Sequence, residues 1–182
     1  MKNNSSFSEY SYTNKEENVT LSLAEFLDKN NWEIVACHPP GGHTSFSLLD
    51  GRRSKGGYMP DIVAIQKNID KNAVPIVIIV ESKDTYDKSD KDIKKLKNLS
   101  AIHADWIGFR LQNLLDRSLW EKEWQNKLQK MIAVGNITNT NRALKDLTEN
   151  PNLIIAKIKK ASIQFFIGKE APAKNFFPNS DF

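Results

Sequence analysis

One segment near the middle of the chain limits the folds that this sequence can adopt. Residues 73–80 (AVPIVIIV) form the longest apolar run, and most of them are β-branched. Eight residues are too few for a membrane-spanning helix, which needs about 20. A β-branched run of this length is typical of a buried central strand. Pro75 should stand at the first residue of the strand, where a missing N–H disturbs the sheet least.

Length and composition fit one globular domain. The chain has 182 residues, close to the usual domain length, and its single cysteine excludes an internal disulfide and a paired-cysteine zinc site. The polar N-terminus lacks the apolar stretch of a signal peptide, so we expect a soluble, cytoplasmic protein. Residues 1–50 carry a net charge of −4 and residues 51–182 a net charge of +8. This asymmetry hints at an acidic partner such as nucleic acid.

Apolar spacing and turn residues divide the rest of the chain into short elements. We expect flexible tails at 1–18 and 171–182 around one domain at 19–170. Predicted helices lie at 21–27, from a cap at Ser89 or Asp90 through 99, in pieces between 106 and 128, and at 142–148. Predicted strands lie at 32–37, 44–49, 61–65, 74–80, 131–134 and 163–167. This order predicts an α/β domain with a mixed central sheet flanked by helices, whose early strands pair antiparallel because their connections are short.

Three charged residues mark the ends of the two clearest strands. Asp61 follows Pro60 and opens one strand, whereas Glu81 and Lys83 close the next. If these strands are neighbours, the two carboxylates lie near each other, and residues 81 and 83 point to the same face. Carboxylate oxygens are the ligands that Mg²⁺ prefers, and a nearby lysine can orient an attacking water. The arrangement suits the hydrolysis of a phosphodiester bond.

The spacing of Glu81 and Lys83 has little value without its context. Chance alone gives about two or three acid-x-Lys triplets in a chain of this composition, and two occur, Glu81-Ser82-Lys83 and Asp92-Ile93-Lys94. Only the first ends a buried strand and follows a Pro-Asp at the start of the preceding strand. The alternative is that these charges only mark where a strand reaches solvent.

Pro60-Asp61 followed by Glu81-Ser82-Lys83 resembles the motif of the PD-(D/E)xK nuclease superfamily, which includes many type II restriction endonucleases. The resemblance covers roughly residues 20–136 and implies a restriction-endonuclease-like core. It implies that Asp61 and Glu81 bind Mg²⁺, for which Mn²⁺ can substitute, with the Ser82 backbone carbonyl as a further ligand. It also implies that Lys83 assists the attacking water and that the products carry 5′-phosphate and 3′-hydroxyl ends.

Many members of that superfamily also use an acid from the first helix, and Glu25 is the candidate by position. Ser22 and Glu25 also match a capping box, in which the glutamate binds a free backbone N–H at the helix start. Both interpretations of Glu25 stay open at the level of sequence.

Two groups of basic residues are candidates for binding DNA. Arg52, Arg53 and Lys55 lie in a glycine-bearing loop before Asp61, where a phosphate clamp or a solvated hairpin tip is equally compatible with the sequence. The second group shares one helix face after the E-x-K strand and consists of Lys91, Lys94 and Lys95. His43, in the turn HPPGGH, is a weaker candidate.

Together these features predict a Mg²⁺-dependent endonuclease that cuts double-stranded DNA at specific sequences, as a type II restriction enzyme does. A chain this short has little room for a separate recognition domain, so we expect a homodimer, with residues 105–130 as a dimer or recognition element. The alternatives are a structure-selective nuclease acting at junctions or in repair, and a nucleic-acid-binding module without catalytic activity.

Overall fold

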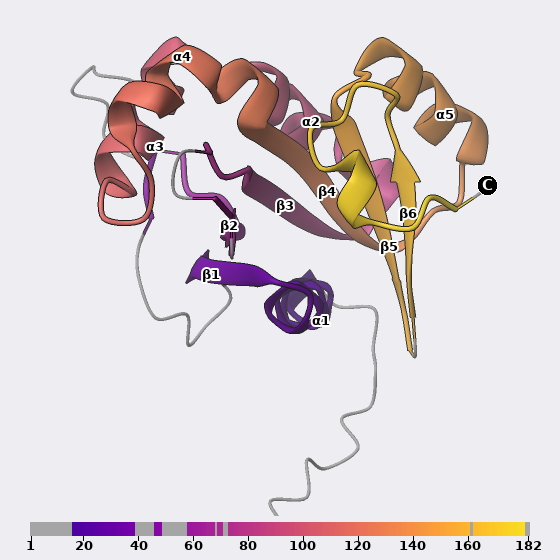
Figure 1. The fold of residues 1–182 in the computed structure, drawn as a ribbon. Helices are drawn as coiled ribbons and strands as arrows, with labels where there is room; N and C mark the ends of the chain where they lie inside the picture. The colour runs from indigo at the N-terminus through magenta and orange to yellow at the C-terminus, as the bar shows by residue number, and fades with distance from the viewer. Residues whose placement is uncertain are drawn as a thin grey trace, which may run out of the picture.

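The computed structural model describes residues 16–38, 46–48, 58–67, 69–70, 73–160 and 162–180. Within them, six strands form one mixed sheet in the order β1-β2-β3-β4-β5-β6 (Figure 1). No helix in these ranges is long and apolar enough to cross a membrane. The predicted α/β class is confirmed. The strands are β1 (Trp32–Cys37), β2 (Ile62–Gln66), β3 (Val77–Thr85), β4 (Leu128–Asn136), β5 (Leu153–Lys159) and β6 (Ser162–Ile167).

The sheet combines both pairing directions. β1, β2 and β3 pair antiparallel as predicted, although the link from β1 to β2, residues 38–61, is not short. β3, β4 and β5 pair parallel, and helices lie between them in sequence, as parallel pairing requires. β6 returns antiparallel to β5. The sheet is therefore mixed, with its parallel part at the centre.

The apolar run forms the central strand β3, with boundaries that differ from the prediction. β3 begins at Val77, two residues after Pro75, so the proline lies outside the ladder that it would interrupt. The strand continues past the apolar run to Thr85, because residues 81–83 keep pairing with β4, Glu81 with Ile132 and Lys83 with Val134. The charged residues therefore belong to the strand and are held by its ladder.

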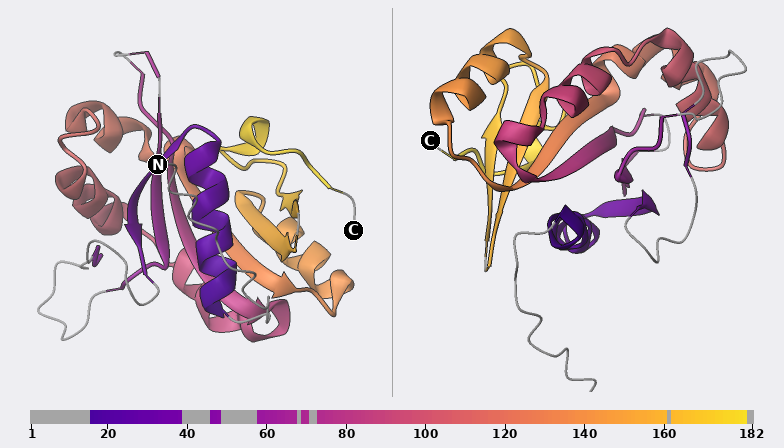
Figure 2. Two further views of the ribbon diagram at one scale, coloured as in Figure 1. Left: turned by 90° about the horizontal axis from the view of Figure 1, so that it is seen from below. Right: turned by 180° about the vertical axis from the view of Figure 1, so that it is seen from behind.

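Helices cover both faces of the sheet (Figures 1 and 2). On one face, α1 (Glu16–Lys29) buries Val19, Leu23 and Leu27, which recur every fourth residue. After α1, Asn31 adopts a positive φ of 70°, a conformation that asparagine tolerates at a helix end. The other face packs against four helices, and the predicted apolar side of α2 is buried there. These helices are α2 (Asp90–Lys97), α3 (Ala101–Arg110), α4 (Arg117–Lys127) and α5 (Thr140–Glu149).

Several predicted boundaries are wrong. α1 begins at Glu16, inside the predicted N-terminal tail, so Ser22 lies in the middle of the helix and no capping box forms there. Much of the predicted C-terminal tail belongs to the core, because Ala171, Ala173 and Phe177 are buried beside α1 and a short 3₁₀ helix, Lys174–Phe176, lies among them. The strand β5 was not predicted. Its first four residues are all buried, which removes the alternation that identifies a strand.

Two predicted segments lie largely outside the described residues. Of the strand expected at 44–49, only residues 46–48 are described, and Leu48 forms an isolated antiparallel bridge with Tyr58. The turn that contains His43 and the loop that contains Arg52, Arg53 and Lys55 are outside the described ranges.

Candidate functional site

Asp61 and Glu81 lie on neighbouring segments at one edge of the sheet. Asp61 directly precedes β2, and its backbone N–H donates to the Val80 carbonyl at 2.9 Å. The Asp61 carboxylate in turn accepts a hydrogen bond from the Ser82 N–H at 2.7 Å. The register of β2 against β3 thus places the Asp61 side chain beside the start of the E-x-K sequence, as predicted.

Glu81 is the most deeply buried acid of this group. Its side chain is 3% exposed, and Oε1 is buried without a hydrogen-bond partner among the described residues. Burial, and secondarily the Asp61 carboxylate, raise the pKa of Glu81 to about 7. Burial also raises the pKa of Asp61, although the Ser82 N–H opposes the change. The Asp61 carboxylate thus disfavours the charged form of Glu81, as expected for two acids that lie close together.

Lys83 extends to acids from two helices. Its Nζ lies 2.9 Å from Glu16 Oε1 at the start of α1 and 3.6 Å from Asp92 Oδ2 on α2. Burial acts to lower the pKa of Lys83, but the Glu16 hydrogen bond and the Asp92 carboxylate outweigh it, so the pKa is raised. Lys83 is therefore a stable cation next to the carboxylate pair.

Asp92 is a residue of the site that the sequence motif missed. It is 4% exposed in its side chain and lies between two lysines, 2.9 Å from Lys95 Nζ and 3.6 Å from Lys83 Nζ. Lys95 also lies 3.5 Å from Glu81 Oε2 and 5.7 Å from the centre of the Tyr58 ring. The available signal was the second acid-x-Lys triplet, on the helix that follows the E-x-K strand.

Six charged residues thus form one group, which we call the carboxylate–lysine cluster: Glu16, Asp61, Glu81, Lys83, Asp92 and Lys95. The Tyr58 hydroxyl is buried next to it, beside the Glu81 carboxylate, without a hydrogen bond of good geometry to any described residue. Burial and the Glu81 carboxylate raise the pKa of the Tyr58 phenol, so it stays protonated. Four carboxylates face two ammonium groups, and the cluster has an excess of negative charge.

Of the remaining predicted site residues, those that the structure describes are not part of the cluster. Glu25 is two-thirds exposed and pairs with Lys29 on the surface of α1. Nine residues separate it from Glu16, about 14 Å along a helix. Lys91 and Lys94 are exposed on α2, whereas Lys95, predicted with them, belongs to the cluster. His43, Arg52, Arg53 and Lys55 lie outside the described residues.

The cluster suits a hard divalent cation only through part of its acids. Within the described ranges, no group of three or more His, Cys, Asp or Glu residues is arranged to hold a metal ion. Asp61 and Glu81 nevertheless bring two carboxylates close together, and Glu81 Oε1 lies beside the buried Tyr58 hydroxyl without a hydrogen bond of good geometry to any described residue. Oxygen donors of this kind match the preference of Mg²⁺, which keeps several waters and needs few protein ligands.

No protein-family model, curated protein sequence or solved structure matches this chain significantly. Inference about function therefore rests on the geometry of the cluster and on the motif resemblance described above.

Proposed function

We propose that this protein is a Mg²⁺-dependent endonuclease that hydrolyses phosphodiester bonds of double-stranded DNA, as type II restriction endonucleases do. The observation that carries the proposal is the proximity of Asp61, Glu81 and Lys83: the Asp61 carboxylate accepts from the Ser82 N–H and lies close enough to raise the pKa of both Glu81 and Lys83. Residues 51–182 carry the positive charge that a DNA backbone requires, and Lys91 and Lys94 stand exposed on the helix that also bears Asp92 and Lys95.

Each residue of the cluster has a distinct task in this proposal. Asp61 and Glu81 would hold the metal, with the Ser82 carbonyl as a further ligand. Bound Mg²⁺ would supply charge neutralisation at the phosphate and a more acidic water. Because Lys83 has a raised pKa and stays protonated, it acts as a hydrogen-bond donor to the attacking water and the phosphate oxygens, and not as the base. Water would add to phosphorus and lose a proton to solvent, the P–O3′ bond would break, and O3′ would take up a proton from solvent, which leaves a 5′-phosphate and a 3′-hydroxyl.

A homodimer is part of the proposal, because two copies of the site would cut both strands of a symmetric sequence. Ile102 and Phe109 on α3 and Leu114 after it are large apolar side chains with 43–55% of their surface exposed. Phe109 and Leu114 fall within the predicted dimer or recognition element, residues 105–130, and Ile102 lies just before it. A mass measurement in solution that finds only monomer, with and without DNA, would contradict this part alone.

The test is digestion of a supercoiled plasmid of known sequence with Mg²⁺, comparing the wild type with Asp61→Asn and Lys83→Met. Lys169→Met, at an exposed position after β6, is the matched control. We expect the two site variants to lose at least about 1,000-fold in initial rate while keeping the wild-type circular dichroism spectrum, and the control to cut normally. Normal cutting by both site variants would refute the assignment.

The same assay separates the alternatives. Discrete bands with a fixed end sequence support a restriction-type enzyme. Cleavage of branched DNA with no cleavage of linear duplex would identify a structure-selective nuclease. Salt-sensitive retention of DNA without cleavage, in Mg²⁺ or Mn²⁺, would identify a binding module.

A further inference from the structure

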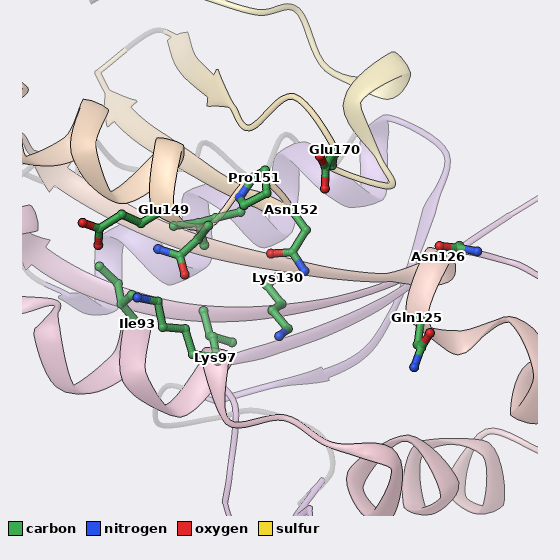
Figure 3. Close-up of a pocket in the computed structure, with 12 residues that line it drawn as sticks. Ile93, Lys97, Gln125, Asn126, Lys130, Glu149, Pro151, Asn152 and Glu170 are labelled. Atoms are coloured by element: carbon green, nitrogen blue, oxygen red, sulfur yellow. The ribbon is translucent and has the colours of Figure 1, made fainter.

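A cavity of about 480 Å³ opens on the face of the sheet that α2, α3, α4 and α5 cover, and no residue of the carboxylate–lysine cluster lines it (Figure 3). Its floor is the beginning of β4 and β5, and its walls come from α2, the end of α4 and the link between α5 and β5. Its volume lies in the range of small-molecule sites, roughly 300–1,000 Å³. α2 separates the two places, because Asp92 and Lys95 face the cluster whereas Ile93 and Lys97 line the cavity.

Lys130 on the floor of this cavity departs from the pattern of its strand. In the sheet it pairs with Ile79 on β3 and Leu153 on β5, which are both buried. Central parallel strands are normally apolar at such positions because helices cover both faces. Figure 3 shows the Lys130 side chain in the middle of the lining residues, between Lys97 and Gln125.

Among the residues that the structure describes, the Lys130 ammonium has no counterion. No hydrogen bond or ion pair joins it to any residue in the described ranges, although the side chain is largely buried. Glu149 and Glu170 also line the cavity, but both are exposed, and Glu149 lies 3.7 Å from Lys145. Burial alone lowers the pKa of Lys130, which is the sign of a cation with nothing to balance it.

The chemistry around Lys130 favours an anion. Lys97 brings a second positive charge to the wall, and the side-chain amides of Gln125 and Asn152 can donate hydrogen bonds. The two carboxylates at the edge oppose a long polyanion such as DNA, and the enclosed shape fits a small molecule. An unpaired buried cation is unfavourable in the empty protein and becomes favourable when an anion binds.

We propose that this cavity binds a small molecule carrying a phosphate or carboxylate group, with Lys130 as the residue that anchors that group. The site is independent of the proposed nuclease activity, because no residue of the carboxylate–lysine cluster lines the cavity.

The test is thermal unfolding of the full chain without Mg²⁺, at constant ionic strength, with inorganic phosphate, adenosine 5′-monophosphate, acetate or citrate. The proteins compared are the wild type, Lys130→Met and the exposed control Lys122→Met. We expect one class of anion to raise the unfolding midpoint by about 2 °C or more in the wild type and the control, and not in Lys130→Met. A response to the phosphates alone assigns a phosphate site, and a response to the carboxylates alone assigns a carboxylate site.

A second measurement does not depend on the variant. Amine-specific labelling of the wild type, read by mass spectrometry, should show Lys130 protected by the anion that raises the midpoint, while Lys122 is labelled at an unchanged rate. The proposal is overturned if no anion in the panel shifts the wild-type midpoint, if the shift persists in Lys130→Met, or if labelling of Lys130 is unchanged by the anion.

Discussion

The carboxylate–lysine cluster and the Lys130 cavity both place charged side chains on the same face of the same sheet. The charges of the cluster are paired with one another, whereas Lys130 pairs with no described residue. Glu81 on β3 and Lys130 on β4 are only two residues apart in register, since Ile79 pairs with Lys130 and Glu81 with Ile132. Glu81 has Lys95 at 3.5 Å, and Asp92 holds both nearby lysines. Lys130 has no partner among the described residues.

The difference separates two ways in which a protein keeps a buried charge. In the cluster, acids outnumber lysines, and each lysine is paired with carboxylates. In the cavity, Lys130 lies among apolar residues of its strand and pairs with no described residue. The two regions should therefore respond to opposite ligands, a divalent cation in the first and an anion in the second. Each of the following changes tests one side of this contrast.

The largest effect is expected from Glu81→Gln in the dependence of stability on pH. The pKa of Glu81 is about 7 in the folded protein, above its ordinary value of 4.5, so the folded state holds the proton more tightly than the unfolded state. This contribution is fully present below pH 4.5 and is lost as pH rises through 7. The loss amounts to about 3 kcal/mol. Glu81→Gln should remove it, which urea unfolding at pH 5 and pH 8 would measure.

The same experiment with Mg²⁺ sharpens the contrast. If Asp61 and Glu81 hold the ion, Mg²⁺ should stabilise the wild type at pH 8 more than at pH 5, and should have little effect on Glu81→Gln. Glu123→Gln, an exposed change on α4, should behave as the wild type. Equal loss of stability between pH 5 and pH 8 in the wild type and Glu81→Gln would show that Glu81 is not the group responsible.

Asp92→Asn should have the next largest effect, through the two lysines that Asp92 holds. Without its charge, Lys83 and Lys95 each lose one of two acid partners, and we expect the rate of DNA cleavage to fall about 10- to 100-fold. Asp92 raises the pKa of Lys83, so the alkaline limb of the pH–rate profile should move to lower pH in the variant. A reduced rate with an unmoved profile would limit Asp92 to a structural role.

A smaller effect of opposite sign is expected at Lys130. Lys130→Met replaces an unpaired, half-buried ammonium with an apolar side chain of similar length, so the free energy of unfolding should rise by about 1 kcal/mol in the absence of ligand. Lys122→Met, at an exposed site, should change it by less than about 0.5 kcal/mol. Destabilisation by Lys130→Met would mean that the ammonium has a partner, and the contrast between the two regions would fail.

The sequence predicted those parts of the site that depend on neighbouring strands. Asp61 and Glu81 follow from a Pro-Asp before one strand and an acid at the end of an apolar run, and antiparallel pairing of β2 and β3 then brings them together. The strand β5 was missed because complete burial of its first half erases the alternation of apolar and polar residues.

The helical residues of the cluster could not be predicted in the same way. Asp92 reaches the site because α2 packs its apolar side on the sheet, which turns one edge of the helix toward the end of β3. Spacing along the chain does not reveal where a helix lies over a sheet. The acid of the first helix could not be predicted either. α1 begins at Glu16, before its apolar pattern starts, and the acid near Lys83 is Glu16, nine positions before the predicted Glu25.

The smallest effects come from a comparison of these two glutamates on one helix. Glu16 Oε1 lies 2.9 Å from Lys83 Nζ, whereas Glu25 pairs only with Lys29 at the surface. Glu16→Gln should lower the rate of DNA cleavage several-fold, because it weakens the hold on Lys83, and Glu25→Gln should leave the rate within about twofold. Both exchanges are isosteric and lie on the same helix, so a general loss of helix stability would affect them alike. A larger loss of activity in Glu25→Gln than in Glu16→Gln would show that Glu25, as the sequence predicted, is the acid of α1 that acts at the site. It would also mean that α1 lies differently over the cluster.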